Sequence, residues 1–422
     1  MLLEQKNNEF FSKKTPRPLT MQYLGGKSRI VESILEEISR TFSQQDKFVD
    51  LFAGSGVVAF EAQCKGYDVI ANDIQPYSAT ILTSLLNFDT CSLKPIITEL
   101  EGVTHQIIFS GSREKYLSDY FQELSFFNQV QQEKLEWKEY KNFVENTKLC
   151  SGNAKEIETL KGTEKWTLFL SYYRNTYFGI YQSAELDFLR EFAEKFPKES
   201  KEHILACIVS AMTYCVSSTT HLAQFLKPNS QTSTINLIKK RSTSIVEEVL
   251  KRLKALESNS SNSRNGVTAK VFQKDFKSAL KEISLDSNTI VYADPPYFKE
   301  HYSRYYHVLD TFILYDYPQL TYNKRIGSTT IGRYREDRIT SDFGKKALAK
   351  SAFESLIDSC MNAGAKLAIS YACSSIVDSD FFHKHAIKRN LKIEVKEFYL
   401  KHTGQGQARH KDVTEYLFLI SQ

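Results

Sequence analysis

The chain alternates between short apolar runs and segments in which apolar residues recur at helical spacing. Mainly apolar runs at 47–52, 68–74, 289–294 and 366–372 predict buried strands. The first two runs enclose a glycine-containing loop and a helical stretch, and residues 28–42 form another helical stretch ahead of them. Strand, loop, helix and strand in this order predict the opening of a doubly wound α/β sheet. Two apolar runs near the C-terminus, LKIEVKEFYL and EYLFLI, predict a terminal hairpin.

The amino-acid composition changes between the second strand run and the third. Residues 110–200 are rich in Tyr, Phe, Lys and Glu and contain few β-branched runs, which predicts a mostly helical segment. The Ser/Asn-rich stretch ESNSSNSRNG is the clearest linker in the chain. The expected division is a polar arm at 1–20, one α/β domain split into 21–87 and 263–422, and an inserted helical domain at 88–262.

The composition is that of an ordinary globular protein and restricts the choice of partners. Of 422 residues, 41% are hydrophobic and 25% are charged, so a large core can form and global disorder is not expected. The formal net charge of +5 permits a polyanionic partner without requiring one. Seven scattered cysteines without a CxxC pair indicate neither a zinc site nor a disulfide framework, and they fit a reducing cytoplasm. The N-terminus is too polar for a signal peptide, and no apolar run approaches the ~20 residues that span a membrane.

The stretch VYADPPYF at 291–298 ends a buried strand run in an unusual way. Pro295 and Pro296 have no N–H to donate, so strand pairing stops and nearby carbonyls lose their ladder partners. Asp294 precedes them, and Tyr297 adds a flat ring. A carboxylate, free carbonyls and an aromatic plate at a strand end predict a site for a flat, amino-bearing group. The alternative is a simple strand-to-loop stop with an incidental tyrosine.

The residues DLFAGSG at 50–56 follow a strand run and open a helix. Gly54 and Gly56 let the backbone approach a ligand closely, and the N-terminus of the helix offers unpaired N–H groups. Asp73 ends the next strand about 20 residues further on, where nucleotide-binding α/β folds hold ribose hydroxyls. The loop lacks the GxGxxG pattern, which disfavours a dinucleotide. The combination predicts adenosine-type binding, with a plain tight turn as the alternative.

Two further short segments supply charged candidates. YLGGK at 23–27 precedes the first helix, and Lys27 is either a cation that meets a carboxylate or a solvated lysine at a turn. Asp275, in VFQKDF at 271–276, is either an acceptor for an adenine amino group or a surface acid at a turn. Neither segment decides its own role without the rest of the chain.

Five separated motifs together resemble one known enzyme family. YLGGK, DLFAGSG, ANDI, KDF and ADPPY, in this order and with a long insertion between ANDI and KDF, resemble the class-alpha DNA adenine-N6 methyltransferases, the family of the GATC-type enzymes. SYA at 370–372 and the stretch GQGQARHKDVTEYLFLI resemble later core strands of that family, so the resemblance covers somewhat over half of the chain. It implies an S-adenosylmethionine-dependent methyltransferase fold, which is a doubly wound mixed α/β sheet with a terminal antiparallel hairpin. It also implies that 21–87 and 263–422 are the catalytic domain and that 88–262 is an inserted, mostly helical DNA-recognition domain.

The resemblance also implies roles for individual residues. S-adenosylmethionine would be bound by Tyr23, Gly25, Gly26, Lys27, Asp50, Phe52, Ala53, Gly54, Gly56, Asp73, Ile74, Asp275 and Phe276. The catalytic group would be Asp294, Pro295, Pro296 and Tyr297. Asp294 and the Pro295 carbonyl would bind the amino group of a flipped adenine, and Tyr297 would stack on its ring.

This catalytic group suits amino-group methylation on chemical grounds as well. An exocyclic amino nitrogen is a poor nucleophile because its lone pair is delocalised into the ring. Two acceptors on its hydrogens would favour tetrahedral geometry and free the lone pair to attack a sulfonium methyl group in line. Positioning and electrostatics supply most of the rate in such a reaction, and no metal is needed.

Several polar residues are candidates for DNA contact. Arg174 and Asn175 lie in LSYYRNTYFGIYQ, which resembles a segment near the DNA in the family. The family continues with glycines there, whereas this chain continues with QSAELDFLREF, which has a helical pattern and puts a GATC target in doubt. The loop RIGSTTIGRYREDR adds Arg325, Arg333, Arg335 and Arg338 as phosphate or base contacts. The alternatives are a helical core for the tyrosines and a solvated surface for the loop.

The leading hypothesis is a site-specific DNA adenine methyltransferase that acts on duplex DNA, either in a restriction–modification system or as a solitary methylase. We expect a cytoplasmic monomer, whose functional partner in the first case is a cognate restriction endonuclease. One alternative is a methyltransferase for another amino group, such as cytosine N4, RNA adenine or a protein glutamine amide. Another is a catalytically silent DNA-binding module, against which the intact DPPY and glycine loop argue.

Overall fold

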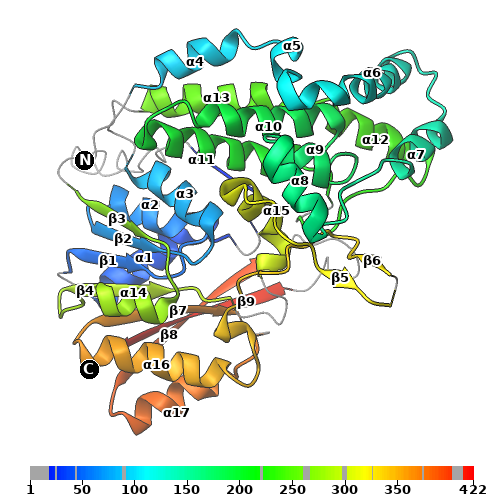
Figure 1. Cartoon of the computed structure of the whole chain (residues 1–422). Coiled ribbons are helices and arrows are strands. Elements are labelled where there is room, and N and C mark those ends of the chain that lie inside the picture. Colours follow the sequence, from blue (N-terminus) through cyan, green and yellow to red (C-terminus); the bar gives the residue numbers. More distant parts are fainter. Residues whose placement is uncertain are drawn as a thin grey trace, which may run out of the picture.

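The centre of the computed structural model is a seven-stranded mixed sheet (Figure 1). The structure describes residues 19–23, 26–42, 45–87, 92–218, 222–259, 267–296, 302–325, 327–372, 375–401 and 412–422. The strands of the sheet are β1 (Lys47–Asp50), β2 (Asp68–Asn72), β3 (Ala269–Phe272), β4 (Thr289–Ala293), β7 (Lys366–Ala372), β8 (Lys392–Lys401) and β9 (Asp412–Ser421). The predicted mixed α/β architecture is confirmed.

One edge of the sheet collects the carboxyl ends of its parallel strands. The strand order is β3-β2-β1-β4-β7-β9-β8, in which the first five strands are parallel and β9 is antiparallel to both β7 and β8. Asp50 at the end of β1 lies opposite Ala71 of β2 and Tyr292 of β4. The chain leaves β1 towards β2 on one side and returns to β4 on the other, which is the switch point where open α/β sheets bind ligands.

Helices cover both faces of the sheet because successive strand residues point to opposite sides. Phe48 and Tyr292 belong to one apolar core, and their neighbours Val49 and Val291 belong to a second. Helices that contribute to the first core include α1 (Val31–Thr41), α2 (Val57–Cys64) and α3 (Pro76–Leu86), and those of the second include α14 (Phe276–Glu282), α16 (Ala349–Asn362) and α17 (Asp380–Lys388).

A helical half, drawn in cyan and green in Figure 1, lies over the first face of the sheet. Its helices are α4 (Lys94–Glu101), α5 (His105–Ile108), α6 (Leu117–Gln131), α7 (Trp137–Glu145), α8 (Ala154–Thr163), α9 (Leu168–Tyr172), α10 (Ile180–Ala193), α11 (Lys198–Cys215), α12 (Gln231–Arg241) and α13 (Ile245–Asn259). Helix α11 packs against α3 and α13, and Ile208 of α11 shares one core with Leu82 of α3 and Tyr292 of the sheet. The helical half is therefore joined to the sheet through a continuous apolar interior.

Between β4 and β7 the chain first packs against the helical half and then returns to the sheet. Helix α15 (Tyr302–Leu314) packs against α3 and α11. Strands β5 (Tyr322–Asn323) and β6 (Ser328–Thr329) then form an antiparallel ribbon that projects from the body, yellow in Figure 1. A short 3-10 turn, Asp342–Gly344, leads back to α16. Most of the predicted arm at 1–20 lies outside the described residues, and within the described residues no helix is long and apolar enough to cross a membrane.

Candidate active site

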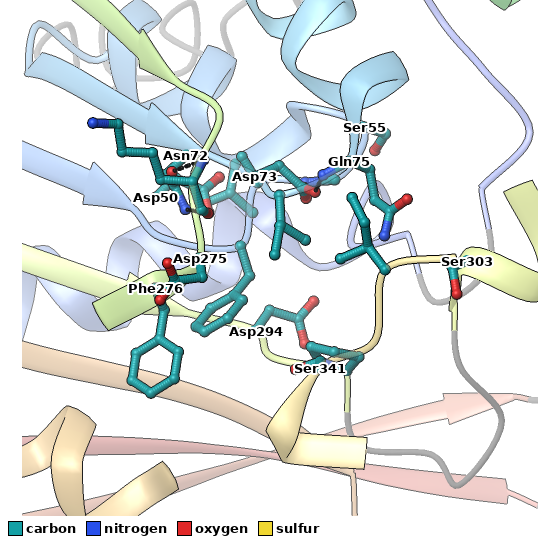
Figure 2. A pocket seen from close by; sticks show the side chains of 18 of the residues that line it. Asp50, Ser55, Asn72, Asp73, Gln75, Asp275, Phe276, Asp294, Ser303 and Ser341 are labelled. Carbon is teal, nitrogen blue, oxygen red and sulfur yellow. Dashed lines mark hydrogen bonds between the residues drawn. The ribbon is translucent and has the colours of Figure 1, made fainter. Parts of the chain in front are cut away.

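The carboxyl edge of the sheet holds a cavity of about 300 Å³. Figure 2 shows lining side chains near the ends of β1, β2 and β4, among them Asp50, Asp73 and Asp294, with Ser341 beside Asp294 and Ser303 further away. The predicted cofactor residues that line it are Tyr23, Gly26, Lys27, Asp50, Phe52, Ala53, Gly54, Asp73, Ile74, Asp275 and Phe276. Of the predicted catalytic residues, Asp294 and Pro296 line it as well. Motifs that are far apart in the sequence thus meet at one place.

The remaining residues of the predicted site do not line this cavity. Gly25 and Tyr297 lie outside the described residues. Gly56 is the N-cap of α2, with a φ of 77° that glycine adopts without steric cost, so its role is to turn the chain into the helix. Pro295 is buried beside the lining residues.

Gly54 and Asp73 fix the shape of the loop after β1. Gly54 has a φ of 52°, and a Cβ at this position would lie 2.7 Å from the Tyr23 hydroxyl, so the close approach requires glycine. Gly54 N donates to Asp73 Oδ2 over 2.9 Å, and Gln75 N donates to Asp73 Oδ1 over 2.8 Å. Each carboxylate oxygen can accept more than one hydrogen bond. Asp73 is therefore held by the backbone and can still accept hydroxyl donors from a ligand.

Asp50 is a buried acid at the end of β1, with 1% of its surface exposed. Its Oδ2 accepts a hydrogen bond from Ala59 N over 3.1 Å, which ties the strand end to α2. Burial, together with the negative charge of Asp294, raises the pKa of Asp50 well above its ordinary value. A buried carboxylate in this situation is stabilised by a nearby cation, so the cavity favours a ligand that carries positive charge.

Asp275 and an aromatic cluster form one wall of the cavity (Figure 2). Asp275 is the N-cap of α14, and its Oδ1 accepts from Ser278 N over 3.2 Å. Hydrogen bonding with Ser278 lowers the pKa of Asp275. The Phe276 ring lies 6.1 Å from that of Phe52 and 4.9 Å from that of Phe343, measured between centroids. A carboxylate beside an apolar surface suits a flat heterocycle that carries an amino group.

The two carboxylate oxygens of Asp294, which follows β4, have different surroundings. Oδ2 lies 3.1 Å from Lys27 Nζ. Oδ1 is buried and has no hydrogen-bond partner among the described residues. Burial raises the pKa of Asp294 to about 6, although the Lys27 ammonium opposes the shift. A buried acceptor without a partner is costly, which is a reason to look for a donor that a ligand supplies.

The predicted cation Lys27 is buried and bridges two acids. Its Nζ lies 2.8 Å from Glu415 Oε1 in addition to the contact with Asp294. Glu415, on β9, also accepts from Ser370 Oγ of β7 over 2.9 Å. Burial disfavours the ammonium, but the two carboxylates outweigh it and raise the pKa of Lys27 above its ordinary value. The sequence prediction omits Glu415 and Ser370, and the available signal was a lone acid in the apolar run EYLFLI.

Other lining residues belong to no motif. Ser303 Oγ and Gln75 Oε1 are buried without a hydrogen-bond partner among the described residues. Residues 339–342 and Gly344 form a further part of the lining, anchored by Phe343, whose ring lies 5.2 Å from that of Phe52. No local pattern identifies these residues, because they reach the cavity only when the chain returns from the ribbon to the sheet.

Arg174 and Asn175, predicted to contact DNA, are buried in the helical half. Arg174 is 8% exposed, and its guanidinium donates to the carbonyls of Leu170 and Lys148. Asn175 Nδ2 donates to Thr147 Oγ1 over 2.9 Å. These hydrogen bonds hold neighbouring segments of the helical half together.

Arg333 and Arg335 are predicted to contact DNA from the loop at 325–338. In the structure both side chains are buried and bind other parts of the protein where this loop joins the body. Arg333 is 8% exposed and donates to the Cys150 carbonyl. Arg335 is 4% exposed and pairs with Asp316 and Asp337, each over 2.8 Å. Both guanidiniums are committed to contacts within the protein in this structure.

The other two arginines of this loop are accessible. Arg325 is exposed beside the ribbon strands. Arg338 is half-buried, with its guanidinium 4.9 Å from the centre of the Tyr334 ring. The ribbon region also exposes 58% of Tyr322 and 59% of Ile331. The projecting part of the loop thus exposes the cation Arg325 together with Tyr322 and Ile331.

The chain belongs to the D12 class N6 adenine-specific DNA methyltransferases, whose family model matches residues 23–329. Type II methyltransferase M.FokI of Planomicrobium okeanokoites is 21% identical, with 95% of this chain and 53% of that protein covered. Type II methyltransferase M.CviAII of Paramecium bursaria Chlorella virus 1 is 25% identical, with 94% and 97% covered. Modification methylase LlaI of Lactococcus lactis subsp. lactis is 25% identical, with 90% and 51% covered. The chain spans about half the length of M.FokI and LlaI and nearly all of M.CviAII. The predicted family is confirmed.

Proposed function

We propose that the protein transfers a methyl group from S-adenosylmethionine to the exocyclic amino group of adenine at a specific site in duplex DNA. The observation that carries the proposal is the meeting of the family's motifs at one cavity, with Asp294 Oδ1 unpartnered among the described residues there. The central sheet with its β8–β9 pair is then the methyltransferase sheet, and residues 88–262 are the inserted target-recognition domain.

The cavity residues fit S-adenosylmethionine, which would supply the methyl group from its positively charged sulfonium. Asp73 keeps acceptor capacity for ribose hydroxyls, and the Asp275 wall suits the adenine ring. The raised pKa of Asp50 indicates a carboxylate that a cation would stabilise. Gln75 Oε1 is a further buried acceptor without a partner among the described residues. A cavity of about 300 Å³ lies within the range of small-molecule sites.

The residues after β4 act on the target amino group. Asp294 Oδ1 and the Pro295 carbonyl accept hydrogen bonds from the two N–H groups of this amino group. These bonds favour tetrahedral nitrogen and free its lone pair from the ring. The lone pair then forms the N–C bond while the electrons of the S–C bond stay on sulfur, and the nitrogen releases one proton to water. Tyr297 keeps its predicted role of stacking on the flipped base.

The ribbon β5–β6 and its flanks supply DNA contacts next to the cavity. Lys324 and Arg325 are exposed in this segment and Arg338 is half-buried, and residues 339–342, directly after Arg338, line the cavity. A projecting element with exposed cations and exposed Tyr322 and Ile331 suits a groove or an unstacked base step. The ribbon would therefore touch the duplex close to the flipped base.

Two relatives are named type II methyltransferases and one a modification methylase, so we propose that this protein is the modification enzyme of a restriction–modification system. It would act as a monomer in the cytoplasm, with a cognate restriction endonuclease as its functional partner.

The proposed activity is tested with purified protein, methyl-labelled S-adenosylmethionine and DNA from a methylation-free host. Nuclease digestion and mass spectrometry should find N6-methyladenine, and single-molecule sequencing should place it at one short sequence. N4-methylcytosine as the product, or label in RNA or protein and not in DNA, would overturn the proposal.

A further inference from the structure

Segments that carry Asp294 and Glu415 contact the Lys27 ammonium, and a further segment supports this contact through Ser370, which bonds Glu415. Lys27 precedes α1, Asp294 follows β4, Ser370 lies in β7 and Glu415 lies near the start of β9. Because β9 runs antiparallel to β7, its first residues lie at the same edge as the carboxyl ends of the parallel strands, and Glu415 is in register with Ala372, the last residue of β7. Lys27 and Glu415 are 6% and 3% exposed, so their contact is shielded from water.

The position of the ammonium decides how the Asp294 carboxylate is presented. Lys27 Nζ lies 3.1 Å from Asp294 Oδ2 and 2.8 Å from Glu415 Oε1. This arrangement leaves Asp294 Oδ1 without a partner among the described residues. An ammonium has three donors, and without Glu415 it would be drawn towards both oxygens of Asp294. Glu415 therefore pulls Lys27 away from the oxygen that the target amino group needs.

We propose that Glu415, supported by Ser370, is a positioning residue for methyl transfer. It holds the Lys27 ammonium so that Lys27 binds Oδ2 of Asp294 and leaves Oδ1 for the amino group of the target base. This inference rests on the proposed function, because it assigns Asp294 to that amino group.

The same network sets the pH at which Asp294 is ionised. The charged and titratable groups that face Asp294 include Lys27, Glu415, Asp50 and Tyr292. Burial raises the pKa of Asp294 to about 6, Lys27 lowers it and Glu415 raises it. The ionised form is the acceptor, so the methylation rate should fall as the pH drops through about 6. Removal of the Glu415 charge lowers the pKa of Asp294 and should move this acid limb to lower pH.

The test compares Glu415→Gln with the wild type in single-turnover methylation of duplex DNA across pH. We expect a rate loss on the order of 10- to 100-fold on the plateau. The acid limb should shift to lower pH, while the dissociation constant for DNA stays within about twofold. The affinity for S-adenosylmethionine should fall by less than the rate, because Lys27 lines the cofactor cavity but the main change is in the presentation of Asp294. Glu415→Asp keeps the charge and should return the limb towards its wild-type position. Glu394→Gln, at an exposed position of β8, is the matched control. It should change neither the plateau rate nor the position of the acid limb.

A second readout does not depend on activity. Acetylation of lysines followed by mass spectrometry should find Lys27 protected in the wild type and more reactive in Glu415→Gln, with Ser370→Ala in between. If the wild type methylates no DNA, the proposed function fails, and the labelling still tests the positioning of Lys27.

Several results would overturn the inference. These are an unmoved acid limb, unchanged Lys27 labelling, or a loss that lies only in S-adenosylmethionine affinity, which would make Glu415 part of the cofactor site. If Glu415→Gln does not fold, Ser370→Ala carries the test through the labelling of Lys27 and a smaller loss of rate, and unchanged labelling there would contradict the inference.

Discussion

Buried charged groups at the sheet edge and in the helical half are treated differently by their surroundings. In the helical half, Asp187 accepts from Phe169 N and Leu170 N over 2.8 and 2.9 Å and from the Tyr315 hydroxyl. At the sheet edge, Asp294 receives Lys27 on one oxygen, and its other oxygen is buried without a partner among the described residues. Both oxygens of the first acid are hydrogen-bonded within the fold, whereas one oxygen of the second has no partner among the described residues and can accept from a ligand.

The comparison shows that a perturbed pKa does not by itself mark a functional site. Burial raises the pKa of Asp187 and of Glu185 to about 7. The pKa of Asp187 is thus further above the ordinary aspartate value than that of Asp294, which burial raises to about 6. Both oxygens of Glu185 are also hydrogen-bonded within the fold, one by Ile245 N over 2.7 Å and the other by the Ser244 hydroxyl. A buried carboxylate oxygen without a partner among the described residues, beside a cavity, distinguishes Asp294 from Asp187 and Glu185. The acids and cations of the two regions should therefore respond in opposite ways to mutation.

The largest effect is expected for Asp294→Ala, which tests the sheet-edge side of the comparison. The rate of methyl transfer should fall by about 10²- to 10⁴-fold, because the acceptor that activates the amino nitrogen is lost. The affinity for S-adenosylmethionine should stay within a few-fold. The free energy of unfolding should change little, because one oxygen of Asp294 is unpartnered among the described residues and Lys27 keeps its contact with Glu415. Single-turnover kinetics, calorimetry and urea unfolding measure these quantities. Loss of cofactor binding would instead move Asp294 out of the base pocket.

The opposite response is expected for Arg241→Ala in the helical half. Arg241 is fully buried and donates to Tyr140 Oη, over 2.9 Å, and to the Thr176 carbonyl, also over 2.9 Å. Its removal should lower the free energy of unfolding by about 3–5 kcal/mol, because buried acceptors lose a charged donor. The methylation rate per folded molecule should be unchanged.

Urea unfolding and active-site-normalised kinetics separate these two effects. Lys239→Ala, at an exposed position of the same helix, is the matched control. It should leave both the free energy of unfolding and the methylation rate unchanged. A variant at Arg241 that stays stable and loses turnover would show that the helical half has a direct part in catalysis.

The same contrast explains what the sequence could predict. The strand runs and the motif residues at strand ends were predictable because both depend on local pattern and on the rule that ligands bind at the carboxyl edge of parallel strands. Arg174 is predicted to contact DNA because its aromatic-rich segment resembles one near the DNA in the family, and Arg333 because it lies in a loop rich in arginine. Their burial depends on which carbonyls the fold brings within reach, and no local pattern contains that information. Glu415 and Ser303 were missed for the same reason, since each becomes part of the site only through packing of distant segments.

The smallest effect concerns the ribbon, where Arg325 and Arg333 are separated by a few residues but lie in different surroundings. Arg325→Ala should weaken binding to duplex DNA a few-fold, with little dependence on sequence, and make the salt dependence shallower by about one, because an exposed phosphate contact is lost. Arg333→Ala should leave that slope unchanged and lower the free energy of unfolding, because the buried bond to the Cys150 carbonyl disappears. Binding isotherms at several salt concentrations and urea unfolding of both variants make the comparison. A shallower slope for Arg333→Ala with unchanged stability would mean that this guanidinium leaves its buried site when DNA binds.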